Sequence, residues 1–187
     1  MAPGAISIDH TGNITSEDGR GISAQSTGGP VEITLDGTID AADEGIFASG
    51  VGGITITTYT GNTVTGGSKG IAAYNSGGGA VEITANGHVE ATAANGIGVY
   101  AYNGAAGDEL TVTTDSVTAG DLGILARNCG TGDTTITTNG AAMGGDYGIY
   151  AEHFGADGAL VIYANGDVEG TGDTGILHGA MASMPTA

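Results

Sequence analysis

The stretch GIAAYNSGGGAVEITANGHV, Gly70–Val89, contains the pattern that decides the fold of this chain. Gly-Ile opens it, and Val81 and Ile83 alternate with polar neighbours, as in a strand with one buried face. Asn86-Gly87 then precedes a further apolar residue, and Asx-Gly pairs favour turns because both residues tolerate left-handed backbone. The stretch therefore predicts three short strands that are separated by turns.

The pattern recurs through the chain at steps of 24 to 27 residues. The repeated pairs are Gly21-Ile22, Gly45-Ile46, Gly70-Ile71, Gly96-Ile97, Gly123-Ile124, Gly148-Ile149 and Gly175-Ile176. Ala follows two positions after most of these Ile residues, and Val99 takes that position once. A nearly constant period of this length is typical of a solenoid, in which each unit buries its apolar face against the next.

The repeat predicts an all-β fold, a single-stranded parallel β-helix of about seven coils of 24–27 residues. We expect a right-handed β-solenoid, because parallel crossover connections are almost always right-handed. The predicted domain spans 5–178, and 1–4 and 179–187 are expected to be tails or remnants of cloning. A sandwich or a propeller is less favoured, since neither has a 25-residue period.

Composition excludes several classes of function. The chain has 187 residues and a net charge of −18, with three basic residues against 21 acidic ones. Phosphate contacts need Lys and Arg, so we expect no nucleic-acid partner and no contact with anionic lipid. A single cysteine, Cys129, excludes an internal disulfide framework and a cysteine-ligated zinc site. Met1–His10 lacks the pattern of a signal peptide, and no apolar run has the length of a membrane span.

The repeat resembles the passenger regions of large Gram-negative autotransporters, the adhesin-like proteins of type V secretion. The matching stretches are GISAQSTGGPVEITLDGTI (Gly21–Ile39), GIFASGVGGITITT (Gly45–Thr58) and the stretch Gly70–Val89 quoted above. The resemblance implies a passenger fragment that is exported through the outer membrane to the cell surface or the extracellular space. It also implies a structural and adhesive role, with a protein or glycan on a host or neighbouring cell as partner.

Aromatic residues supply the candidate ligand-binding site. Tyr74, Tyr100, Tyr102, His153 and Phe154 follow the Gly-Ile-x-Ala strand, where insertions also gather and where we expect a variable loop. Insertions in repeat proteins often map to one binding face. The alternative interpretation is a row of exposed rings that covers one corner of the coil.

Two sets of acidic residues are further candidates for a site. Asp121, Asp146 and Asp173 fall on successive coils, about 4.8 Å apart, where they either bind a divalent cation or remain solvated in their own turns. Glu32 and Glu82 share an outward position two coils apart, which would suit a carbohydrate-active β-helix enzyme, a hydrolase or lyase. We expect solvated carboxylates in both places, and hence no catalytic residue, no metal and no cofactor.

The ends of the solenoid predict weak self-association. The first coil begins at Ile6 and the last is lost after Leu177-His178, with no recognisable cap. Exposed strand edges invite pairing with a second chain, so end-to-end stacking is expected. The charge of −18 on each chain opposes this contact.

Overall fold

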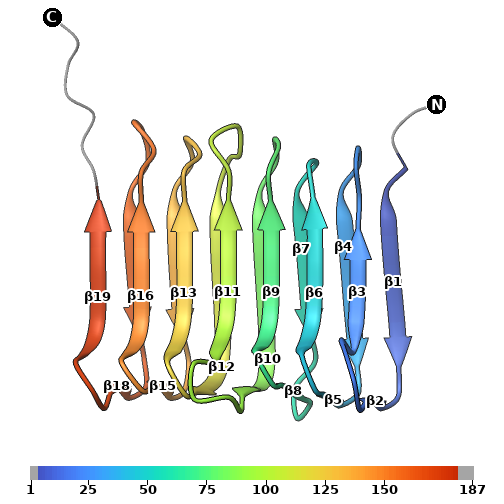
Figure 1. The fold of residues 1–187 in the computed structure, drawn as a ribbon. Helices are drawn as coiled ribbons and strands as arrows, with labels where there is room; N and C mark the ends of the chain where they lie inside the picture. Colours follow the sequence, from blue (N-terminus) through green and yellow to red (C-terminus); the bar gives the residue numbers. More distant parts are fainter. Residues whose placement is uncertain (1–3, 181–187) are drawn as a thin grey trace, which may run out of the picture.

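The computed structural model describes residues 4–180 as a right-handed parallel β-helix of about seven coils, which confirms the predicted fold class (Figure 1). One strand of each coil joins a seven-stranded sheet that faces the viewer in Figure 1. Its members are β3 (Ile22–Gln25), β6 (Glu44–Gly50), β9 (Lys69–Asn75), β11 (Ile97–Asn103), β13 (Leu122–Asn128), β16 (Tyr147–His153) and β19 (Thr174–Ala180).

A twelve-stranded sheet forms the rest of each coil. Its long strands are β1 (Ile6–Thr11), β4 (Val31–Asp36), β7 (Ile54–Thr58), β10 (Val81–Ala91), β12 (Leu110–Ala119), β14 (Thr134–Thr138) and β17 (Leu160–Ala164). Its short corner strands are β2 (Ile14–Ser16), β5 (Ile39–Ala41), β8 (Thr63–Gly66), β15 (Ala142–Gly144) and β18 (Val168–Gly170). The corner strand merges with the long strand in β10 and β12, so the predicted three strands per coil are found in most coils but not all.

Aliphatic rows run along the axis of the solenoid and form its core. Ile33 pairs in register with Ile56, Ile56 with Ile83, and Ile83 with Val112, and all four side chains are fully buried. Their neighbours Glu32 and Glu82 are exposed. The strand faces are therefore as the alternation predicts, and each coil completes its core against the coils above and below.

Close approach between coils explains why glycine precedes each core Ile of the seven-stranded sheet. A Cβ on Gly45 would lie 2.6 Å from the carbonyl oxygen of Gly70 in the next coil and 2.6 Å from Val64 Cγ1. Real Cβ atoms are not found at such distances, so only glycine lets the chain pass this corner.

Close approach between coils also explains the glycines of the Asx-Gly pairs, for which left-handed backbone was expected. Gly37, Gly87, Gly140 and Gly166 do not have left-handed backbone. β10 even continues as a strand through Asn86-Gly87. A Cβ on Gly140 would lie 2.6 Å from the carbonyl oxygen of Asp115 in the preceding coil. Glycine is required there by the tight stacking of coils and not by a left-handed backbone conformation.

The fourth Gly-Ile pair, Gly96-Ile97, is not equivalent to the other pairs in the structure. Val99 of β11 pairs in register with Ile71 of β9, and it is fully buried. The equivalent pair is therefore Gly98-Val99 instead of Gly96-Ile97, and Ala101 takes the Ala position. The extra residues lie in the turn at 92–96, between β10 and β11.

Residues 1–3 and 181–187 of the expected tails lie outside the described residues, and β19 continues to Ala180. Within residues 4–180 the structure contains no helix that could cross a lipid bilayer.

Candidate functional site

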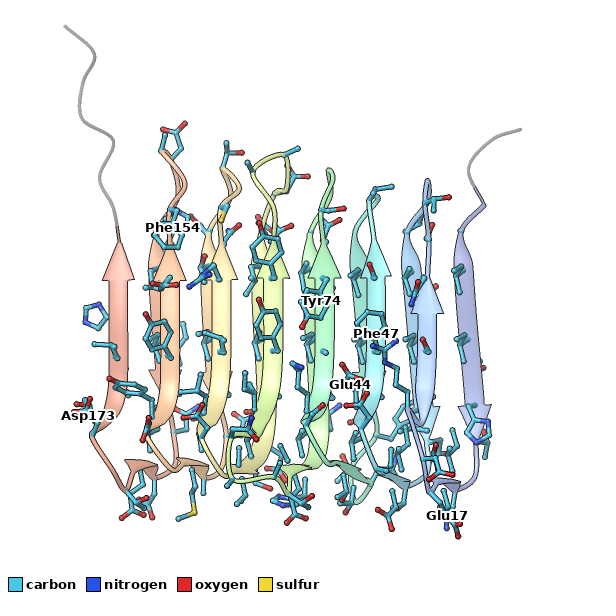
Figure 2. All side chains as sticks on the ribbon, viewed as in Figure 1. Glu17, Glu44, Phe47, Tyr74, Phe154 and Asp173 are labelled. Carbon is cyan, nitrogen blue, oxygen red and sulfur yellow. The ribbon has the colours of Figure 1, made fainter. Side chains whose placement is uncertain are left out.

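The outer surface of the seven-stranded sheet, which we name the aromatic face, differs from the rest of this acidic molecule. It carries six of the nine aromatic side chains of the chain, namely Phe47, Tyr74, Tyr100, Tyr102, Tyr147 and Tyr150. All three basic residues, Arg20, Lys69 and Arg127, lie there too. Outward positions of β6 to β16 therefore form a surface of rings and cations (Figure 2).

A diagonal row of rings crosses three neighbouring strands of the aromatic face. The ring centroids of Phe47 and Tyr74 are 5.6 Å apart, and the stacked rings of Tyr74 and Tyr100 are 4.7 Å apart. Ala72 lies between Phe47 and Tyr100 in the register and has no exposed surface, because the rings cover it. Burial raises the pKa of the Tyr74 and Tyr100 phenols, so both remain neutral at physiological pH.

Glu44 forms ion pairs with two cations at the N-terminal end of this row. Arg20 Nε lies 2.7 Å from Glu44 Oε2, and Lys69 Nζ lies 3.8 Å from Glu44 Oε1. The guanidinium of Arg20 also lies 3.8 Å from the centroid of the Phe47 ring, a cation–π distance (Figure 2). The pair with Glu44 raises the pKa of Arg20, which holds its charge on this face.

A second cluster of charges and rings lies on β13 and β16. Arg127 Nε donates to Glu152 Oε2 at 2.6 Å, and the pair raises the pKa of Arg127. The hydroxyl of Tyr150 donates to Glu152 Oε1 at 3.0 Å. The hydroxyl of Tyr147 donates to Asp173 Oδ2 at 2.6 Å. The rings of Tyr147 and Tyr150 meet edge to face, with centroids 5.5 Å apart.

Next to this cluster the aromatic face is hollowed. The open cavity has a volume of about 300 Å³. Leu122 and Leu125 of β13 contribute its apolar lining, and Tyr147 and Tyr150 stand beside them in the next coil. The hollow arises because Leu125 is shorter than Tyr100 and Tyr150, which precede and follow it in the same row.

Two carboxylates border the hollow. Asp121 and Asp146 occupy equivalent positions in successive coils, and the amide of Asp146 donates to the carbonyl of Asp121 at 2.9 Å. Burial and the charge of Asp146 raise the pKa of the Asp121 carboxyl. Neither carboxylate has a basic partner among the residues that the structure describes.

The last residues of three strands of the same sheet form a buried ladder of asparagines, which the sequence did not lead us to expect. Asn75, Asn103 and Asn128 are fully buried, and their side-chain amides bind the loops that lead into the other sheet. Asn103 Nδ2 donates to the carbonyls of Asp108 and Glu109 at 3.1 Å, and Asn75 Nδ2 donates to Asn103 Oδ1 at 2.8 Å. The ladder holds the turns at the top of Figure 1 and so fixes the end of the aromatic face.

His153 takes the ladder position in the next coil. His153 is 3% exposed, with Nδ1 3.0 Å from Thr134 Oγ1 and Nε2 3.0 Å from the carbonyl of Asp157. Both ring nitrogens are therefore occupied inside the coil, where no ligand reaches them. His153 is therefore not part of an exposed aromatic row, because its side chain points into the coil.

The other predicted site residues lie close together but not in the expected loop. Tyr74 belongs to β9, and Tyr100 and Tyr102 belong to β11. Phe154 alone follows its strand, with Arg127 5.7 Å from its ring centroid. Tyr74, Tyr100 and Tyr102 therefore share one surface, but that surface is a sheet and not the expected variable loop.

Of the acidic candidates, only Asp121 and Asp146 lie together. Asp173 is hydrogen-bonded to Tyr147, whereas Asp121 and Asp146 border the hollow. Within the described part of the chain, no three metal-ligating side chains come together. Glu32 and Glu82 stand on the twelve-stranded sheet with Thr55 between them in the register.

Comparisons with family models, with curated proteins and with solved structures give no match to this chain.

Proposed function

We propose that this protein is a non-catalytic, adhesive segment of a surface-exposed or secreted bacterial protein, and that the aromatic face is its contact surface. The observation that carries the proposal is the concentration of six aromatic and all three basic side chains on one face of a chain with net charge −18. Aromatic residues and Arg are enriched at binding interfaces, whereas acidic residues are depleted there.

The charge distribution supports the choice of this face. Elsewhere the molecule presents acidic side chains that repel a second negative surface. On the aromatic face Arg20 and Arg127 balance Glu44 and Glu152. A partner therefore meets both aromatic rings and paired charges on this face.

The rigidity of the face also suits binding. Tyr74 and Tyr100 are half-buried and stacked, and strand pairing on both sides fixes their backbones. Rings that are already ordered lose little conformational freedom when a partner docks. The partner we propose is a protein or glycan on a host or neighbouring cell, in keeping with the resemblance to autotransporter passengers and the cell-surface location it implies.

Adhesion of coated beads to bacterial and epithelial cells tests this function. Beads that carry the wild-type chain should adhere, and beads that carry Tyr74→Ser/Tyr100→Ser should lose most of the adhesion. The matched control is Tyr163→Ser, which removes an exposed tyrosine from the twelve-stranded sheet and should leave adhesion unchanged. Circular dichroism of each variant verifies the fold.

The proposal would be contradicted if Tyr74→Ser/Tyr100→Ser adhered as well as Tyr163→Ser. It would also be contradicted if the wild-type chain did not adhere. Release of reducing ends from a polysaccharide by the purified chain would overturn its non-catalytic part and favour the enzyme alternative. The flanking gene sequence gives a further test of the passenger assignment, since a downstream membrane-barrel segment is expected.

A further inference from the structure

The hollow on the aromatic face has a chemistry that selects its occupant. At about 300 Å³ it lies at the small end of ligand pockets, so it accommodates one side-chain-sized group and not a chain of sugars. Leu122 and Leu125 offer the apolar surface that an alkyl chain would cover.

Most polar groups around the hollow are already engaged. The hydroxyl of Tyr147 donates to Asp173, and the hydroxyl of Tyr150 donates to Glu152. Arg127 is ion-paired with Glu152. The tyrosines consequently present ring carbon to the hollow, and no basic group at its edge is free for an anionic ligand.

The carboxylates of Asp121 and Asp146 are the exception. An ionised carboxylate only accepts hydrogen bonds, so these groups are matched by a ligand that donates them and carries positive charge. Burial and the charge of Asp146 together raise the pKa of Asp121, and a bound cation would relieve the repulsion between the two carboxylates.

From this geometry we infer that the hollow binds a primary alkylammonium group, the side chain of a lysine on a partner protein. The butyl chain lies over Leu122 and Leu125, the ammonium donates to Asp121 and Asp146, and the rings of Tyr147 and Tyr150 flank it. A primary ammonium has three donors, whereas a quaternary amine has none and leaves the carboxylates unpaired. A basic partner is also the one that a chain of net charge −18 attracts.

This inference rests on the proposed function, because it names the partner chemistry of the same face. The two remain separable by experiment. Adhesion without ammonium binding overturns the inference alone, and ammonium binding by a chain that does not adhere overturns the proposed function alone.

The test is a titration of the ¹³C-labelled protein with n-butylammonium chloride at constant ionic strength, followed by the methyl resonances of Leu122 and Leu125. We expect saturable shifts at these methyl groups, with weaker binding of choline. Asp121→Asn/Asp146→Asn should lower the affinity at least about tenfold. Tyr150→Leu should lower it by about threefold, the contribution of one ring.

Glu32→Gln is the matched control. It removes one exposed negative charge from the opposite sheet and should leave the affinity unchanged. The aspartate variant removes a repulsive pair and is expected to fold, and circular dichroism verifies this.

Four results would overturn the inference. The first is a shift that does not saturate and that Glu32→Gln changes as much as Asp121→Asn/Asp146→Asn does. The second is tighter binding of choline than of butylammonium. The others are saturable binding of methyl β-glucopyranoside at these leucines, and displacement of butylammonium by stoichiometric calcium.

Discussion

Replacement of Asn103 by Ala removes the centre of the buried asparagine ladder. The side chain donates to the carbonyls of Asp108 and Glu109 at 3.1 Å and accepts from Asn75 at 2.8 Å. Three hydrogen bonds are lost, at about 1 kcal/mol each. The Glu109 carbonyl keeps the amide of Val81 at 2.9 Å, and the Asp108 carbonyl keeps Asn128 Nδ2 at 3.3 Å. Since neither carbonyl is left without a partner, the free energy of unfolding should fall by about 3 kcal/mol.

Urea titration followed by circular dichroism measures this loss. Asn165→Ala is the control, because Asn165 is exposed and makes one long side-chain hydrogen bond of 3.4 Å, so the expected loss is under about 0.5 kcal/mol. Asn103→Asp keeps the shape but has no amide donor, and at pH 7 it should destabilise at least as much as Ala. A harmless Asn103→Asp, or equal losses at positions 103 and 165, would refute the ladder as a source of stability.

Three further predictions follow from burial, charge and the strand edges. Ile83→Ala should lower the free energy of unfolding by about 2–5 kcal/mol and Thr84→Ala by under about 1 kcal/mol, and equal losses in urea titrations would mean that the faces are reversed. The raised pKa of Asp121 means that its ionisation opposes folding, so Asp121→Asn should raise the free energy of unfolding at pH 7 but not below about pH 4. An increase that does not depend on pH, or an equal increase from Glu32→Gln, would contradict this. Sedimentation at rising salt should show weak, concentration-dependent association through edge strands such as β1 and β19, whereas a strict monomer would contradict open ends.

The core was predictable because a parallel coil repeats its inward positions in every turn. Ile33, Ile56 and Ile83 occupy one buried row, and their spacing in the sequence is close to the repeat length. The repeated glycines were also evident in the sequence, but left-handed turns were expected to explain them. Gly140 is required by contact with Asp115 of the preceding coil, which no local turn rule contains.

The site was harder to predict because outward positions obey no repeat. Tyr74 and Tyr100 stack diagonally from different rows, so neither periodicity nor loop length places them together. The asparagine ladder did have a signal, since Asn75, Asn103 and Asn128 each end a strand at the same distance from its glycine. That signal was hidden by the choice of Gly96 instead of Gly98 as the start of the fourth repeat.

Hydroxyl-radical footprinting on adherent cells tests the central claim most directly, because the chain supplies its own controls. Tyr59 and Tyr163 are 50% and 57% exposed and lie outside the aromatic face. The account predicts that cell-bound protein is protected from oxidation at Tyr74, Tyr100 and Tyr150, while Tyr59 and Tyr163 react as they do in the free chain. Protection of Tyr163 with unchanged oxidation of Tyr100 and Tyr150 would contradict the aromatic face as the contact surface.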